Sequence, residues 1–143
     1  MYRALILALT LIGLPWSKSQ AACSVSTSPV AFGIINLSQL NQTTGRVIVD
    51  CDTATAFDVG ISGETQGGQR VLRRPEGTIL LYQLYSSASL SLPWGDNLTI
   101  GPTVAGTNDG QNANELTVYG AIPPQQNIPP GNYTGLLTVV LTF

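Results

Sequence analysis

The C-terminal stretch GNYTGLLTVVLTF, residues 131–143, decides the fold that the sequence predicts. Its apolar side chains alternate with smaller or polar ones, which is typical of a β-strand with one buried face. The alternating apolar residues are Tyr133, Leu137, Val139, Leu141 and Phe143. A strand this apolar normally pairs along both edges, because an uncovered apolar edge invites aggregation. The sequence offers no later strand to pair with it, so we expect an edge that another strand must cover.

The rest of the sequence predicts an all-β protein, because no stretch keeps a 3.6-residue period and short β-rich runs alternate with turn-forming residues. Turns are indicated by stretches such as SGETQGG, PWGDN and TNDGQN, which are rich in Gly, Pro, Asn and Asp. A polar loop is expected over 94–114, with one short strand near 98–100. The predicted strands are 24–30, 46–52, 57–62, 69–74, 79–85, 116–121 and 133–143.

Residues 1–21 are predicted to be a secretory signal peptide. Arg3 gives a positive start, and the apolar run from Ala4 to Leu14 is too short to span a bilayer. Small residues before the predicted cut favour cleavage after Ala21, to within one residue. Residues 22–143 are therefore expected to form one exported domain.

The charge of this domain is mildly acidic. Once Arg3 and Lys18 are removed, four arginines remain against eight acids, which gives a net charge of −4. A chain of this charge without lysine is a poor binder of nucleic acid or of anionic lipid, so we expect no nucleic-acid partner. The only basic cluster is RVLRR, residues 70–74, and we expect its arginines on a solvated strand face.

The exported domain holds two cysteines, Cys23 and Cys51. An oxidising compartment favours a disulfide between them. The alternatives are two free thiols or a metal pair, but without histidine or further cysteines a zinc or iron–sulfur site has too few ligands. A lipidated Cys23 is disfavoured, because Gln20 stands where a large apolar residue would be needed. We expect no cofactor.

Seven strands, with a bridge between the first two, predict an immunoglobulin-like β-sandwich that is one strand short. The missing neighbour would be the one that covers the C-terminal strand. We therefore expect an incomplete sandwich with an open groove beside that strand.

An ordered set of motifs resembles the spore coat protein U domain family, and it covers essentially all of 22–143. The first motifs have Cys followed by Phe-Gly, then a Cys-containing strand, then an Arg-Leu stretch before an aromatic strand. The closing segment has Tyr-Gly, a proline-rich loop, Gly-x-Tyr and a final apolar strand. The motifs are ACSVSTSPVAFG (22–33), GRVIVDC (45–51), RVLRRPEGTILLYQLY (70–85), WGD (94–96) and VYGAIPPQQNIPPGNYTGLLTVVLTF (118–143).

The resemblance implies a subunit of an archaic chaperone–usher pilus. In such subunits an incomplete immunoglobulin-like sandwich is completed by a donor strand from a periplasmic chaperone or a neighbouring subunit. The implied partners are that chaperone, an outer-membrane usher and neighbouring pilins, and the implied location is a cell-surface pilus reached through the periplasm. The expected groove residues are Val25, Val30, Leu137, Val139, Leu141 and Phe143.

One departure from the family pattern suggests a place in the fibre. A fibre-forming pilin carries its donor strand ahead of its first cysteine, whereas cleavage after Ala21 would leave only Ala22 before Cys23. Such a chain would accept a strand without giving one. We therefore expect a tip or minor subunit that supports adhesion and biofilm formation.

Other classes of function fit the sequence less well. An enzyme is disfavoured, because the sequence has no histidine and no recognisable catalytic motif. Asp50 and Asp52 beside Cys51 are better interpreted as a solvated face than as an acid pair. Four Asn-x-Ser/Thr sequons are better explained as turn residues than as glycan sites. A stand-alone surface or spore-coat-like structural protein would use the same strand exchange in a different assembly.

A sugar-binding adhesin domain is the remaining alternative. Trp94, Asp96 and Asn97 fall in a predicted loop and form a set suited to carbohydrate. The competing interpretation, which we favour, is that Trp94 plugs the end of the sandwich. Likewise, Tyr82, Tyr85 and Tyr119 are expected in core and cross-strand packing rather than in a ligand site.

Overall fold

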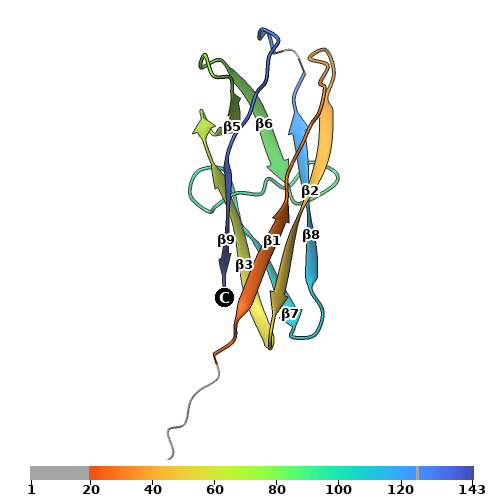
Figure 1. The fold of residues 1–143 in the computed structure, drawn as a ribbon, viewed down its shortest axis with the longest axis vertical. Coiled ribbons are helices and arrows are strands. Elements are labelled where there is room, and N and C mark those ends of the chain that lie inside the picture. Colours follow the sequence, from red (N-terminus) through yellow and green to blue (C-terminus); the bar gives the residue numbers. More distant parts are fainter. Residues whose placement is uncertain (1–19, 125) are drawn as a thin grey trace, which may run out of the picture.

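The computed structural model describes residues 20–124 and 126–143, so the predicted signal peptide lies almost wholly outside the described residues. These residues form two β-sheets that pack face to face as an elongated sandwich (Figure 1). No helix among them is long and apolar enough to cross a membrane. The prediction of an all-β, immunoglobulin-like fold is confirmed.

The large sheet has the strand order β1-β2-β8-β6-β5-β4, and the small sheet has the order β7-β3-β9. All of their pairings are antiparallel. The strands of the large sheet are β1 (Cys23–Ser28), β2 (Asn41–Cys51), β8 (Asn114–Ile122), β6 (Ile79–Tyr85), β5 (Gln69–Arg73) and β4 (Thr65–Gln66). The strands of the small sheet are β7 (Val104–Asp109), β3 (Ala54–Gly63) and β9 (Leu137–Thr142).

Each predicted strand with a clear apolar pattern is present, and the run 79–85 is matched residue for residue by β6. The short strand expected at 98–100 is absent. In its place the sequence VAGTND forms β7, which pairs with β3 and has only one buried residue, Asn108. This strand has no alternating apolar side chains, so periodicity could not indicate it.

The core lies between the two sheets and is made by the inward-facing residues of β2, β3, β6 and β8. Val49 and Val59 are completely buried, as is Leu84. On β9 the inward residues Leu137, Val139 and Leu141 are only partly buried, although they pack against this core. The small sheet is therefore less well covered at β9 than at its centre.

Trp94 joins the two sheets. Its side chain is 1% exposed, and its indole N–H donates to the carbonyl of Val59 at 2.9 Å. The backbone N–H of Trp94 donates to Leu84 O of the large sheet, and Gly95 O accepts from Ile61 N of the small sheet, at 2.9 and 3.0 Å. Residues 86–103 thus cross the interior at this point and form a loop on each outer face.

Like Trp94, Arg70 is buried inside the sandwich, and its side chain has no exposed surface. Its Nη2 donates to the carbonyls of Ile61 and Trp94, at 2.6 and 2.8 Å. Burial lowers the pKa of Arg70, because the charged form is desolvated. The expectation that the RVLRR arginines lie on a solvated strand face is therefore wrong for Arg70, which faces inward opposite Tyr82. Periodicity could not show the inward position of Arg70, because the carbonyls that accept its hydrogen bonds belong to Ile61 and Trp94 and come close to it only in the folded chain.

Cys23 and Cys51 form a disulfide that ties the first residue of β1 to the last residue of β2. The two residues are directly opposite in the strand register. The bridge therefore fixes the start of β1, the edge strand of the large sheet, to β2, its one neighbour in that sheet among the described residues.

We predict that removing this disulfide with Cys23→Ala and Cys51→Ala lowers the free energy of unfolding by about 3–4 kcal/mol, as expected when a cross-link closing a loop of 28 residues is lost. Urea unfolding measures the change. Ser26→Ala, at an exposed position of the same strand, should leave the midpoint unchanged. A loss below about 1 kcal/mol would show that pairing with β2 alone holds β1.

Candidate strand-acceptor groove

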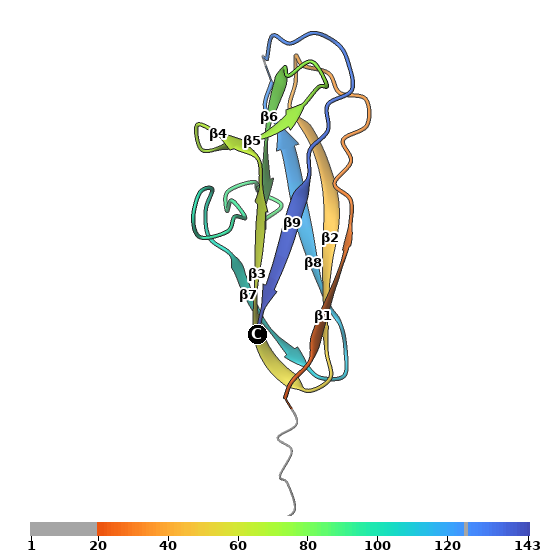
Figure 2. The ribbon, with the colours of Figure 1, turned by 60° about the vertical axis from the view of Figure 1, so that its left-hand side comes forward.

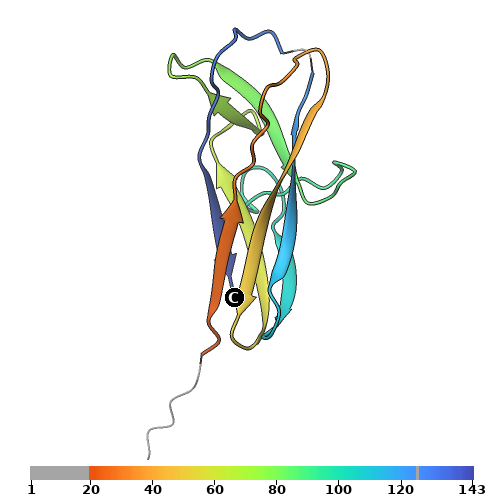
Figure 3. The ribbon, with the colours of Figure 1, turned by 45° about the vertical axis from the view of Figure 1, so that its right-hand side comes forward.

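The edge strands β1 and β9 belong to different sheets but run side by side on one flank of the sandwich (Figure 3). Among the described residues, β1 pairs only with β2 and β9 pairs only with β3. Figure 2 shows β9 crossing in front of the large sheet with β1 beside it. Each strand therefore presents a row of backbone N–H and C=O groups to the space between them.

That space is a groove that contains two adjoining hollows. The first has a volume of about 230 Å³. One rim is formed by residues 27–30, which are the end of β1 and the two residues after it. The other rim is formed by Gly135 and by Leu137 and Val139 of β9. Its floor is the apolar core itself, supplied by four strands of the two sheets. The floor residues are Val47, Ile61, Leu84 and Val118.

The second hollow continues the groove toward the proline-rich end and has a volume of about 550 Å³. It shares Val30 and Gly135 with the first hollow, so the two are continuous. One rim is formed by residues 30–35 and the other by residues 131–135. The floor consists of Leu72, Leu80 and Ile122. The groove therefore lies directly over apolar core residues along much of the flank.

Two glycines on the inner face of the large sheet let the rim pack deeply. A Cβ at Gly45 would approach Val30 Cγ2 to 2.8 Å, and one at Gly120 would approach Phe32 Cζ to 2.9 Å. Because these glycines have no side chain, Val30 and Phe32 reach the sheet, where Phe32 makes an edge-to-face contact with Tyr82 at 6.2 Å between ring centroids. The segment that follows β1 is thus held in place by side-chain packing, although it does not form a strand.

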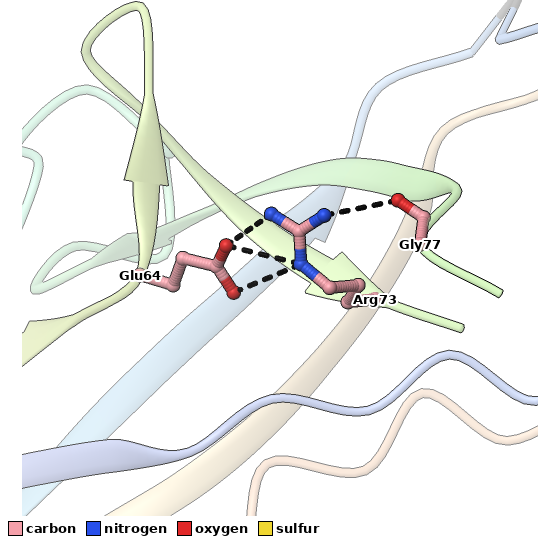
Figure 4. Close-up of polar contacts among 3 residues, drawn as sticks. All are labelled: Glu64, Arg73 and Gly77. Atoms are coloured by element: carbon pink, nitrogen blue, oxygen red, sulfur yellow. Dashed lines mark hydrogen bonds and ion pairs between the residues drawn. The ribbon is translucent and has the colours of Figure 1, made fainter. Parts of the chain in front are cut away.

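The opposite rim is fixed to β5. Arg73 N donates to Thr134 O at 2.8 Å, and Thr134 N donates to Arg73 O at 3.0 Å. Arg73 also pairs with Glu64 and donates from Nη1 to the carbonyl of Gly77 at 3.0 Å (Figure 4). Hydrogen bonds from Arg73 hold the pKa of Glu64 below its usual value. The chain is therefore attached to the large sheet just before it enters β9.

The residues expected in the groove are distributed unevenly. Val30, Leu137 and Val139 line the first hollow. Val25 lies opposite the buried Val49 and so faces inward, yet it is 37% exposed, as expected of a side chain beside an uncovered gap. Leu141 lies opposite Val59 and also faces inward. Phe143 follows the end of β9 and is 57% exposed.

Several groove residues were missed by the sequence interpretation. Phe32 and Ile35 form one rim of the second hollow, and Tyr133 lies on the other. The apolar run PVAFGIINL, residues 29–37, was the available signal, but it has neither a period of two nor a period of 3.6. The floor residues were recognisable only as core, since no pattern indicates which part of a core is uncovered.

The loop that the sequence suggested for surface binding does not present its tryptophan. Trp94 is buried between the sheets, so the interpretation that it plugs the sandwich fits its placement and a surface-binding role for it does not. Asp96 instead accepts hydrogen bonds from the backbone of Leu98 and Thr99, at 2.9 Å each, which lowers its pKa. Asn97 has a positive φ of 64° and exchanges hydrogen bonds with Thr103. Both residues shape the turn.

Comparisons with known proteins give the family. The sequence matches the Spore Coat Protein U domain over residues 11–140. The chain belongs to this family. The match begins at residue 11, inside the predicted signal peptide, and so includes eleven residues ahead of the expected cut. No curated protein matches the chain.

Two solved structures are similar to this Spore Coat Protein U domain. A chain in the crystal structure of the CsuC–CsuE chaperone–tip adhesion subunit pre-assembly complex, from archaic chaperone–usher Csu pili of Acinetobacter baumannii, superposes with a TM-score of 0.62 at 20% identity. That match covers 87% of this chain and 40% of the other, so this chain spans less than half of its length. The E. coli Hda pilus minor tip subunit, HdaB, gives a TM-score of 0.47 at 19% identity, covering 82% and 79% of the two chains. The first of these supports a shared fold.

We predict that Thr134→Pro loosens the rim before β9, because proline has no N–H to donate to Arg73 O. The expected loss of stability is about 1–3 kcal/mol, measured by urea unfolding. Amide hydrogen exchange should also speed up in β9. Thr134→Ala keeps the backbone bond and is the matched control. Equal exchange rates in both variants would show that the Arg73–Thr134 pairing does not hold the rim.

Proposed function

We propose that this protein is a structural subunit of a chaperone–usher pilus and that its groove accepts a β-strand from another protein. The single observation that carries this proposal is the open groove between β1 and β9, whose floor is the apolar core. Membership of the Spore Coat Protein U domain family and the fold shared with a chain of the Csu chaperone–tip subunit complex support it.

A donor strand would satisfy two needs at once. Its backbone would bond the free edge of β9 and extend the small sheet, because half of the N–H and C=O groups of β9 point away from β3. Its inward side chains would fill the hollows over Val47, Ile61 and Leu84. Since side chains alternate along a strand, the donor should carry apolar residues at every second position. Val25, Leu141 and Phe143 would extend this contact beyond the hollows.

The partners follow from this mode of assembly. A periplasmic chaperone would fill the groove after export, an outer-membrane usher would receive the complex, and a neighbouring pilin would replace the chaperone strand in the fibre. The protein would thus pass through the periplasm to a surface pilus. Its role is structural, with no reaction to catalyse, and it requires no nucleic acid.

Within the fibre we propose a tip or minor position, from which the subunit supports adhesion and biofilm formation. The support is the signal-peptide pattern: cleavage after Ala21 would place Cys23, the first residue of β1, next to the mature N-terminus. A chain processed in this way would have a groove to be filled but no strand to insert into a neighbour.

We predict that Val139→Glu abolishes capture by the chaperone, because the inserted strand would bury an unpaired carboxylate in the first hollow. The expected loss is at least about a hundredfold in affinity for a donor-strand peptide, or roughly 2.7 kcal/mol. Val140→Glu is the matched control, since Val140 is the next residue of β9, points to the opposite face and is 51% exposed. Co-purification from the periplasm with the chaperone and titration with the peptide measure both variants.

Two results would contradict the strand-acceptor role. One is equal capture of Val139→Glu and Val140→Glu. The other is a wild-type chain that leaves the periplasm as a stable monomer and melts cooperatively without any partner. A chain that binds the donor peptide yet never enters a fibre would instead be a stand-alone or spore-coat-like structural protein.

The position in the fibre has its own test. We predict that the protein isolated from assembled pili begins at Ala22, to within one residue, and that antibody labelling finds it at fibre ends. Mass spectrometry of the N-terminal peptide measures the first point and immuno-electron microscopy the second. A mature chain that retains the residues from 11 onward, or labelling along the shaft, would overturn the tip position while leaving the strand-acceptor role intact.

A further inference from the structure

The outer face of the large sheet, which faces away from the groove, carries a pair of tyrosines. Tyr85 on β6 and Tyr119 on β8 are direct partners in the strand register, and both point outward. Each is only partly buried. The sequence suggested cross-strand packing for these rings, which their register agrees with, but they pack on a solvent-facing surface and not in the core.

Two hollows lie against this surface. One has a volume of about 190 Å³ and is bounded by Leu40, Gln83 and Tyr85, and the other has about 300 Å³ and is bounded by Gln42, Thr44 and Tyr119. Leu90 lines both, so the hollows are neighbours. Their combined size is at the low end of the range of about 300–1,000 Å³ found for small-molecule sites.

The loop 86–92 forms the wall that the two hollows share. Figures 1 and 3 show it projecting from the large sheet on the side away from β9. Leu90 has a φ of 55°, a left-handed conformation that a bulky residue seldom adopts outside functional or tightly fixed sites. Ser87 Oγ accepts from the backbone of Ser91 and Leu92, at 3.2 Å each, and so fixes the turn. The loop is therefore set in place before any ligand arrives.

The chemistry of this surface indicates a class of ligand. Within the part of the chain that the structure describes, no charged residue lines either hollow. Among the described residues, the solvent-accessible hydroxyls of Tyr85 and Tyr119 and the amide of Gln42 make no hydrogen bond within the protein, and Gln83 uses only its Oε1, which accepts from Leu84 N at 3.0 Å. The surface thus offers flat apolar rings beside groups that can both donate and accept.

We propose that this surface, formed by Gln42, Thr44, Gln83, Tyr85, Leu90 and Tyr119, binds a neutral saccharide. A pyranose ring has an apolar C–H face that packs on a tyrosine ring. The hydroxyls of the sugar form hydrogen bonds with amide and hydroxyl groups of the protein. A charged ligand would lose its hydration without meeting an opposite charge, and a purely apolar ligand would leave the polar groups unpaired. The extended shape of the two neighbouring hollows favours an oligosaccharide over a single sugar.

This site is independent of the strand-acceptor groove. The groove opens between the two sheets, whereas the saccharide site lies on the outer surface of the large sheet, so an inserted strand would leave it uncovered. A pilus subunit could therefore hold a donor strand and a glycan at the same time. Trp94, the residue that the sequence offered for sugar binding, takes no part because it is buried.

The test is calorimetric titration of the exported protein, alone or in the complex in which it is purified, with cellotetraose, maltotetraose and chitotetraose. Saturable binding is expected below about 10 mM, the affinity range for a small ligand with few polar anchors. Tyr119→Ala should weaken it at least about tenfold. Glu115→Gln, an outward residue of the same strand outside both hollows, is the matched control and should bind like the wild type.

Gln42→Ala keeps the test decisive if Tyr119→Ala does not fold, because Gln42 is exposed and its loss should weaken binding several-fold without changing the melting temperature. The site is overturned if no probe gives saturable heat with the folded wild type, or if Tyr119→Ala and Gln42→Ala both bind as well as Glu115→Gln. Repeating the titration with and without a bound donor-strand peptide separates the two sites, since filling the groove should leave saccharide binding unchanged.

Discussion

The unpaired edge of β9 is the constraint on which the rest of the structure depends. β9 carries inward apolar residues from Leu137 to Leu141, but only β3 pairs with it among the described residues. The facing edge, β1, belongs to the other sheet and does not bond to it. Because a sandwich core is closed by strands on both flanks, this gap leaves a groove between the two edges, with core residues as its floor. The proposed assembly role follows from that geometry.

An open flank must be compensated elsewhere, and the structure shows how the two sheets are joined. Trp94 donates to both sheets, and Arg70 of the large sheet donates to the carbonyls of Trp94 and of Ile61 in the small sheet. Away from this junction, the disulfide fixes the start of β1 to the end of β2. The groove rims are fixed by different means, by side chains packed over Gly45 and Gly120 on one side and by backbone pairing to β5 on the other. The groove is therefore a shaped and largely preformed site.

Sequence patterns predicted a strand well where one face of the strand is buried and the other faces solvent. β6 follows strict alternation and was placed without error, and the last strand was recognised from the same period. β7 was missed, because a short polar strand on a sheet edge carries no periodic signal. Arg70 was misplaced for a related reason: its partners are backbone carbonyls 9 and 24 residues away, and no local pattern reports them.

The sequence by itself determined the fold class, the family and the apolar strand near the C-terminus, because these depend on local periodicity, turn chemistry and the order of motifs. Only the tertiary structure decided which residues line the groove, that Trp94 is a core residue and that Tyr85 and Tyr119 share an outer surface. These properties depend on strand register and on which sheet each strand joins. Residues such as Tyr85 and Tyr119, 34 positions apart, meet only when β6 and β8 pair, and a single sequence does not specify that pairing.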